Sequence, residues 1–278
     1  MKEYIPVLTV AGSDCSGGAG IQADIKTISA IGCYAMSVIT AITAQNTTGV
    51  RSVQGIDPKI VYDQMDMIHN DIPPMAVKTG MLYNRDIIDV VSTFLESAGT
   101  SNVVIDPVMM STSGSRLLSD DAIDNMVNRL FPLASIVTPN LQEAISLTGE
   151  TEPMKQALKL NQMGCRNVLL KGGDTDRIDL KVDYLWLEGE EELITLTADA
   201  VNTRNTHGTG CTLSSAIACY LALGFDMLES VTRAKLYVTR GLKAGASVKT
   251  GKGHGPVNHL FAPRHMKYII TNKSSKWK

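Results

Sequence analysis

Residues 5–18 read IPVLTVAGSDCSGG, an apolar run that stops at a cluster of glycine and small polar residues. A continuous apolar run of this length is typical of a strand buried on both faces of a parallel sheet. A helical pattern follows directly, with Ile21, Ile25 and Ile28 on one face. The stretch therefore predicts a strand, a tight turn and a helix, which is the opening unit of an α/β fold.

The same alternation continues along the chain. Residues 183–197 predict a hairpin around Gly189, which we expect to be an antiparallel addition at one edge of the sheet. Strands alternating with helices predict right-handed βαβ units and a mostly parallel sheet. The further expected strands cover residues 35–44, 77–80, 102–106, 135–138 and 167–171, and the helices cover 58–70, 84–98, 119–131, a short stretch from 140, the segment before 164, 208–223 and 226–248.

Composition and charge exclude several classes of protein. The 278 residues are 44% hydrophobic but only 5% aromatic, so the core must be mainly aliphatic. With 26 basic and 28 acidic residues, the chain lacks the overall basic field that holds nucleic acid. Basic residues without acids gather after Pro263, so we expect one domain over residues 1–263 and a solvated basic tail over 264–278.

The cysteines and the uncharged stretches indicate in which cellular compartment the protein is expected. Five cysteines with no CxxC pair argue against a disulfide framework and a zinc site, and they fit a reducing cytoplasm. Residues 27–50 form an uncharged stretch long enough to suggest a membrane span, but they hold many threonine, serine and amide residues, so we expect none. The first residues lack the long apolar run of a signal peptide.

The strongest local signal is NTHGTGCT at residues 205–212, which leads into a helix. The glycines Gly208 and Gly210 would let the backbone approach a ligand, and the helix start offers free amides to a phosphate. Cys211 stands at the helix start, where thiol pKa values fall. The alternative is a plain helix entry with Cys211 as a small buried residue.

Two further clusters follow predicted strands. Asp106 could hold Mg²⁺ or organise phosphates, although an aspartate also begins many turns. Asn140 and Glu143 could cap the next helix, or lie beside hydrated Mg²⁺, or do both. The sequence contains neither a P-loop nor a dinucleotide fingerprint after the first strand.

A third group of polar residues is expected on the same rim of the sheet. Gly12, Asp24 and Gln45 belong to it, and they supply donors and acceptors for a small polar ligand. Gln45 is the most informative, because an amide can pair with a heterocycle that carries both an amine and a ring nitrogen. Asp24 lies five residues into a helix and could instead be a solvent-exposed residue.

Seven motifs follow one another along the chain: AGSDCSGGAGIQAD (11–24), TAQNT (43–47), KTGML (78–82), VIDPVM (104–109), TPNLQEA (138–144), LKGG (170–173) and THGTGCT (206–212). In this order they resemble the motifs of the hydroxymethylpyrimidine/phosphomethylpyrimidine kinases of thiamine biosynthesis, which are ribokinase-like kinases. The resemblance runs from about residue 5 to 261, and it implies a three-layer αβα fold with a small antiparallel edge and no separate lid domain. It also implies a homodimer, and Mg²⁺- and ATP-dependent phosphorylation of 4-amino-5-hydroxymethyl-2-methylpyrimidine and then of its monophosphate.

The resemblance also implies roles for single residues. Gly12, Asp24 and Gln45 would hold the pyrimidine, with Met81 and Val108 against its ring. The remaining residues would serve phosphoryl transfer: Asp106, Asn140 and Glu143 at the Mg²⁺-phosphate end, Lys171 and Lys235 near the nucleotide, Gly208, Thr209 and Gly210 as the anion hole, and Cys211 where related enzymes carry an aspartate base.

The sequence departs from the family pattern in two places. Cys15 stands where proline is common, and residues 110–115, a candidate flap over the substrate, lack the usual lysine. A pyridoxal kinase of the same cysteine-bearing branch is the nearest alternative, and Gln45 favours the pyrimidine over pyridoxal. A non-catalytic binding protein is the alternative from another class. It is disfavoured because Asp106, Glu143 and the GTG run are all present.

Overall fold

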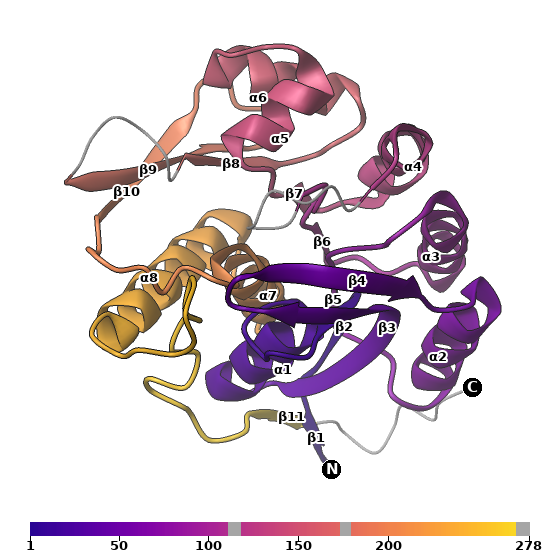
Figure 1. Cartoon of the computed structure of the whole chain (residues 1–278). Coiled ribbons are helices and arrows are strands. Elements are labelled where there is room, and N and C mark those ends of the chain that lie inside the picture. Colours follow the sequence, from indigo (N-terminus) through magenta and orange to yellow (C-terminus); the bar gives the residue numbers. More distant parts are fainter. Residues whose placement is uncertain (111–117, 173–178, 271–278) are drawn as a thin grey trace.

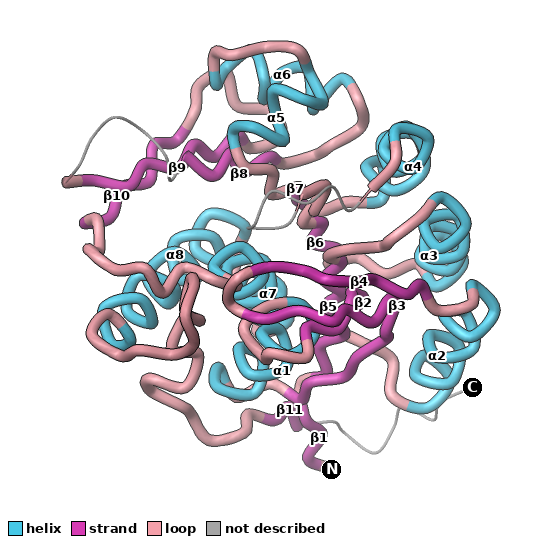
Figure 2. Tube along the Cα trace, viewed as in Figure 1, coloured by secondary structure: helices cyan, strands magenta, loops and turns pink. Residues whose placement is uncertain are grey.

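The computed structural model describes residues 1–110, 118–172 and 179–270. Its centre is a nine-stranded sheet in the order β10-β9-β8-β7-β6-β5-β2-β3-β4, with helices on both faces (Figures 1 and 2). The six strands from β8 to β3 are parallel, which confirms the predicted three-layer αβα architecture. The strands are β2 (Pro6–Asp14), β3 (Tyr34–Asn46), β4 (Gly49–Gly55), β5 (Ala76–Thr79), β6 (Val103–Ile105), β7 (Ile136–Val137), β8 (Val168–Gly172), β9 (Leu180–Trp186) and β10 (Ile194–Asp199).

The helices divide between the two faces, and each face has its own hydrophobic core. The alternation of side chains along the strands decides which core each residue enters: Val7 of β2 packs on one side, and Leu8 and Val10 pack on the other. One face is covered by α1 (Gly20–Ile31), α7 (Thr209–Ala222) and α8 (Met227–Gly245). The other carries α2 (Pro58–Asp71), α3 (Arg85–Ala98), α4 (Asp120–Asn125), α5 (Leu141–Thr148) and α6 (Pro153–Gln162).

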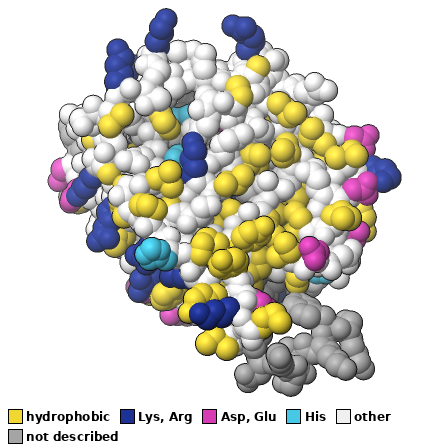
Figure 3. All heavy atoms as spheres, turned by 90° about the horizontal axis from the view of Figure 1, so that it is seen from below, with side chains coloured by type: hydrophobic (Ala, Val, Ile, Leu, Met, Phe, Trp, Pro, Cys, Tyr) yellow, Lys and Arg dark blue, Asp and Glu magenta, His cyan; other side chains and the backbone are white. Residues whose placement is uncertain are grey.

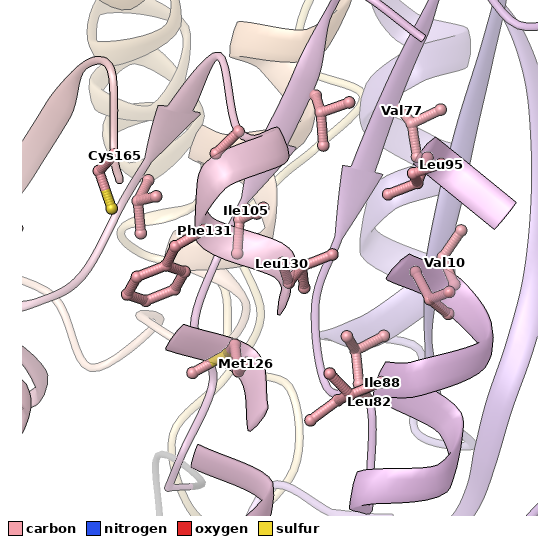
Figure 4. Packing of buried hydrophobic residues seen from close by; sticks show 14 of the residues in the cluster. Val10, Val77, Leu82, Ile88, Leu95, Ile105, Met126, Leu130, Phe131 and Cys165 are labelled. Carbon is pink, nitrogen blue, oxygen red and sulfur yellow. The ribbon is translucent and has the colours of Figure 1, made fainter. Parts of the chain in front are cut away.

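The core on the α3 face shows why a chain with few aromatic residues still packs densely. Aliphatic side chains of the strands, such as Val10, Val77 and Ile105, belong to one buried cluster with Ile88 and Leu95 of α3 (Figure 4). Phe131 is one of the few aromatic members of this core and has no exposed surface. The cores on both sides hold the sheet between its helices, and they leave the ends of the strands free to carry polar loops.

The structure differs from the predicted elements in three places. The expected helix over 119–131 is interrupted: α4 passes into a π-helical turn at Met126–Leu130 and a short 3-10 turn at Phe131–Leu133, where Pro132 removes a backbone donor. Antiparallel strands lie at both edges of the sheet instead of one. β9 and β10 form one edge next to β8, and β4 forms the other edge next to β3. The third difference is a small second sheet.

That small sheet involves part of the segment expected to be a solvated tail. β1 (Lys2–Tyr4) pairs antiparallel with β11 (Tyr268–Ile270). The backbone of Arg264 and Lys267 also donates to the carbonyls of Ala30 and Gly32. The expectation is therefore wrong for residues 264–270, because their backbone is bonded to the domain even though most of their side chains are exposed.

The surface seen from below gathers hydrophobic side chains among scattered charges (Figure 3). The exposed apolar residues of the chain include Tyr4, Ile269 and Ile270 of the small sheet. Among the described residues, no helix is long and apolar enough to span a bilayer.

Candidate active site

A cavity of about 640 Å³ lies at the carboxyl edge of the parallel strands. Its walls come from the segments that end these strands, such as Gly12 near the end of β2, Asp106 after β6 and Lys171 in β8. The helix start after residue 207 closes another side. Such an edge is where open α/β sheets bind ligands, because several loops converge there. The predicted rim of polar clusters is therefore one continuous site.

The structure brings together thirteen of the fourteen residues singled out from the sequence, and these come from separate parts of the chain to contact one cavity. The residues in its wall are Gly12, Gln45, Met81, Asp106, Val108, Asn140, Glu143, Lys171, Gly208, Thr209, Gly210, Cys211 and Lys235. The candidate flap is outside the described residues except for Met110, which also contacts the cavity, and the second glycine of the LKGG motif is outside them as well.

Asp24 is the residue that the structure places elsewhere. Its side chain is fully buried behind the cavity wall, and its Oδ2 atom lies 2.8 Å from the Lys78 Nζ atom. Thr9 donates to the same oxygen at 2.6 Å, and Ser215 donates to Oδ1 at 2.7 Å. Asp24 shares the buried face of α1 with Ile21 and Ile28, which are three and four residues away, so its carboxylate points into the protein.

The Asp24 carboxylate holds a lysine that does reach the cavity. Lys78 contacts the cavity, although its side chain is almost wholly enclosed. Burial, the largest single influence, lowers the pKa of the Lys78 ammonium. The attraction of Asp24 and Asp106 and the hydrogen bond to Asp24 together outweigh burial, so the net pKa is raised. Lys78 is therefore a fixed positive charge behind the site. Asp24 fixes the position of Lys78 and does not contact the cavity, where we expected it to hold the pyrimidine.

Asp106, Lys171 and Glu143 form a polar group opposite the helix start. The Lys171 Nζ atom lies 2.7 Å from Asp106 Oδ1, and Lys171 also donates its backbone N–H to Pro139. The capping box predicted for Asn140 and Glu143 is confirmed, with both hydrogen bonds at 2.8 Å. Burial raises the pKa of Glu143, and nearby Lys171 partly opposes this.

Lys235 is held at another part of the cavity. Its Nζ atom lies 2.6 Å from Asp183 Oδ2, and the backbone N–H of Gly172 donates to the other oxygen at 3.0 Å. The cavity beside this pair is lined by Ala198, Val201 and the α8 residues Val238 and Leu242. This end of the site therefore combines an apolar slot with a lysine.

The first turn of α7 begins at Gly208, whose φ of 81° lies in the left-handed region. A Cβ atom at this position would lie 1.8 Å from the carbonyl oxygen of Gly18, so only glycine fits. The next residues, Thr209, Gly210 and Cys211, contact the cavity, and the first amides of a helix lack partners within it. These amides and the helix dipole make this turn suited to an anion.

The Cys211 thiol behaves differently from the expectation for a helix start. Burial raises its pKa to about 11, and the Lys78 charge opposes this only in part. The thiol is therefore protonated at neutral pH before any substrate enters. It becomes a base only if the bound reactants change its surroundings.

Two groups near the site were not assigned from the sequence. Lys78 belongs to the quoted KTGML motif, and His207 belongs to THGTGCT, so their membership of motifs was the available signal. His207 is buried, and its Nε2 atom lies 2.8 Å from Asp14 Oδ2. The same nitrogen lies 3.5 Å from the amide nitrogen of Gln45. A contact across 193 residues of sequence cannot be found from spacing.

The site combines a cavity at the carboxyl edge of a parallel sheet, a glycine-rich helix start, and lysines and carboxylates that face it. These features define a small-molecule kinase of the ribokinase-like class. The family model described as phosphomethylpyrimidine kinase matches residues 14–258. The chain belongs to the phosphomethylpyrimidine kinase family, which confirms the resemblance seen in the motifs.

Two curated relatives are 45% identical to the chain. One is the hydroxymethylpyrimidine/phosphomethylpyrimidine kinase of Rhizobium meliloti, where the match covers 91% of this chain and 96% of the relative. The other is the thiamine biosynthesis bifunctional protein ThiED of Geobacter sulfurreducens, where it covers 92% of this chain. The chain spans 52% of the length of that bifunctional relative.

Solved structures agree with this assignment. The crystal structure of phosphomethylpyrimidine kinase from Clostridium difficile is 45% identical, with a TM-score of 0.75, and the match covers 86% of this chain and 100% of that one. Pyridoxal kinase from Staphylococcus aureus, in complex with AMP-PCP and pyridoxal, is 33% identical with a TM-score of 0.84. That match covers 97% of this chain and 99% of the other. The fold is thus shared by kinases named for two different substrates.

Proposed function

We propose that this kinase transfers the γ-phosphoryl group of ATP to 4-amino-5-hydroxymethyl-2-methylpyrimidine, and then to the monophosphate to form the diphosphate. The observation that carries the proposal is a continuous cavity, which has an amide-bearing end, an anion-binding helix start in its wall and an apolar end with a lysine. Family membership and the names of the relatives support the same reaction. The specific substrates are inferred from these features together.

The pyrimidine is proposed to lie beside Gln45, Met81 and Val108. A Cβ atom on Gly12 would approach the Met81 methyl group to 2.9 Å, so Gly12 leaves room for that side chain at the cavity wall. The Gln45 amide offers a donor and an acceptor, which match the amine and ring nitrogen of an aminopyrimidine. An unmatched ligand would leave one of these polar groups without a partner, and that costs affinity.

The nucleotide is proposed to occupy the other end of the cavity. The aliphatic residues Ala198, Val201, Val238 and Leu242 offer an apolar slot to a purine, and Lys235 and Lys171 offer positive charge to its phosphates. The phosphoryl group would then meet the first turn of α7. Amides at that turn stabilise the negative charge on the group during transfer, and a loose transition state needs such positioning more than a strong base.

Magnesium fits the oxygen atoms beside Lys171. Mg²⁺ in kinases is held by one or two carboxylates together with substrate phosphates and water. Asp106 and Glu143 both contact the cavity and supply such carboxylates. The ion would neutralise phosphate charge, while Asp106 and Glu143 would orient it.

The remaining parts of the proposal concern organisation. Residues from Gly12 to Lys235 contact one cavity, which supports a single kinase domain instead of two. The five cysteines are free thiols, which supports a reducing cytoplasm. A homodimer is supported by exposed apolar side chains on β1 and β11, such as Tyr4 and Ile270. Sedimentation velocity on the full chain would measure the dimer directly.

A pyridoxal kinase is the second candidate, and the similarity to the Staphylococcus aureus enzyme favours it. The test is ADP release from Mg-ATP with the pyrimidine alcohol, its monophosphate, pyridoxal and pyridoxine as separate acceptors. We expect both pyrimidines to give higher kcat/KM values than either pyridine. Turnover of pyridoxal alone would overturn the proposal in favour of the second candidate.

A further inference from the structure

One imidazole joins the two loops that the proposed reaction must align. We call residues 12–20 the substrate loop and residues 208–211 the anion-hole turn. His207 directly precedes the anion-hole turn, and its Nε2 atom lies 2.8 Å from Asp14 Oδ2 in the substrate loop. Both side chains are nearly enclosed, with 6% and 3% of their surfaces exposed. A contact so well shielded from water is strong and geometrically restrictive.

The other partners of the Asp14 carboxylate belong to its own loop. Its Oδ2 atom accepts the backbone N–H of Gly18 at 3.1 Å and that of Ala19 at 2.9 Å, and Oδ1 accepts from the backbone and the hydroxyl of Ser16. Burial raises the pKa of Asp14, but hydrogen bonds from His207 and the loop outweigh it and lower the pKa to about 2. The carboxylate is therefore ionised and organises the substrate loop around the imidazole.

The protonation of the pair follows from this charge. An ionised carboxylate only accepts hydrogen bonds, so the Nε2 atom of His207 carries a proton and donates it to Asp14. The same Nε2 atom then cannot accept a hydrogen bond from the Gln45 amide nitrogen 3.5 Å away. Gln45 is contacted by the imidazole without being bound to it, which leaves its amide nitrogen to serve a ligand.

The backbone around His207 is fixed as well. Its N–H donates to the Gly255 carbonyl at 3.0 Å, and its own carbonyl accepts from Val257 at 3.2 Å. On the other side, a Cβ atom at Gly18 would lie 2.3 Å from His207 Cδ2. The imidazole is thus wedged between the substrate loop and the segment around residue 256, and neither can move without displacing it.

We infer that His207 is a positioning residue for phosphoryl transfer, which holds the substrate loop at a set distance from the anion-hole turn through Asp14. The inference rests on the proposed function, because the alignment matters only if an alcohol at the substrate loop attacks a phosphoryl group at that turn. Displacing reacting groups by about 1 Å can cost about 100-fold in rate. Loss of the contact should therefore lower kcat more than it weakens binding.

The first test compares His207→Leu with His207→Gln. Leucine fills similar space without a donor, whereas the glutamine amide nitrogen can reach the place of Nε2 and donate to Asp14. We expect kcat to fall about 100-fold in H207L with a much smaller change in the pyrimidine KM, and about tenfold of the loss to be regained in H207Q. Equal kcat values in H207L and the unaltered enzyme would overturn the inference.

A matched control separates positioning from simple loss of a buried histidine. His259 is as buried as His207, and its Nε2 atom has no hydrogen-bond partner among the described residues. His259→Leu should change the melting temperature without changing kcat. If both leucine variants lowered kcat and the melting temperature in parallel, the role of His207 would be structural, and the inference would be wrong.

A second variant displaces the imidazole without altering its chemistry. Gly18→Ala places a methyl group against His207 Cδ2 and keeps the backbone donor to Asp14. It should reproduce the kcat loss of H207L. An unaltered enzyme that phosphorylates none of the four acceptors would contradict the proposed function together with this inference, whereas an active enzyme insensitive to H207L and G18A contradicts the inference alone.

Discussion

Two lysine–aspartate pairs lie behind and beside the anion-hole turn, and they are built differently. The Lys78–Asp24 pair has no exposed side-chain surface, and Thr9 and Ser215 also donate to the Asp24 oxygens at normal distances. The Lys171–Asp106 pair has a similar length of 2.7 Å, but Lys171 is 16% exposed. Asp106 contacts Thr138 at 3.4 Å and Ser214 at 3.3 Å, which are long hydrogen bonds.

The contrast shows that two similar ion pairs have different roles, one in stability and one at the cavity. Asp24 has close donors on both oxygens, so it holds Lys78 and the surrounding elements rigidly and has nothing left to offer a ligand. Asp106 has Lys171 as its close side-chain donor and contacts the cavity, so its oxygens remain able to bind an ion or to order phosphates. A carboxylate whose oxygens all have close hydrogen-bond donors therefore stabilises the fold. A carboxylate at the cavity with few close donors can bind an ion or substrate phosphates.

The greatest change is expected in stability, when the enclosed pair is broken. Asp24→Ala leaves the Lys78 charge buried and alone, which should lower the free energy of unfolding by about 3–5 kcal/mol. Urea unfolding followed by circular dichroism would measure it. The matched control is Asp63→Ala, because Asp63 pairs with Lys59 at 2.6 Å on the exposed surface and should change stability little. Equal effects of the two variants would refute the distinction.

The next effect is expected at the cavity pair. Asp106→Asn should lower kcat about 100-fold, because an amide binds Mg²⁺ and orders phosphates less well than a carboxylate. The free energy of unfolding should change much less than in Asp24→Ala. Steady-state kinetics with varied Mg²⁺ would also reveal a higher Mg²⁺ requirement. If D106N kept its kcat and lost its stability instead, the two pairs would have the opposite roles.

The pH dependence of stability tests a third carboxylate, that of Asp14. It contacts the cavity, and both of its oxygens accept close hydrogen bonds. Its folded pKa of about 2 lies below the ordinary value, so its contribution to stability is full above about pH 5 and is lost as the pH falls through about 2. Asp14→Asn should thus be less stable than the unaltered protein by about 2 kcal/mol at pH 7. Denaturant midpoints from pH 7 down to 2 should converge, and a constant difference would count against this pKa.

The mildest effect is expected at Cys211. Cys211→Ser should lower turnover about tenfold and leave the pyrimidine KM nearly unchanged, because the site keeps its shape and loses only proton acceptance. Burial holds the thiol pKa at about 11, so the thiolate fraction rises with pH. The kcat/KM of the unaltered enzyme should therefore rise more steeply with alkaline pH than that of C211S. Unchanged turnover in C211S would rule out its assignment as the base.

Local sequence signals predicted the parts of the fold that depend on neighbours along the chain. The strand, turn and helix at residues 5–31 and the Asn140–Glu143 capping box follow from patterns within a few residues, and both are present. β4 was missed because GVRSVQG is a half-exposed edge strand with little apolar alternation. The pairing of β1 with β11 could not be seen, because it joins segments from opposite ends of the chain.

The site shows the same division. The motifs alone were enough to establish the family, most of the cavity residues and the glycine at residue 208, because they preserve the residue types that the chemistry needs. It took the folded chain to show that Asp24 holds Lys78, that Cys211 is protonated, and that His207 meets Asp14. Charge, burial and hydrogen bonding depend on distances between remote segments, and packing sets those distances where spacing along the chain cannot.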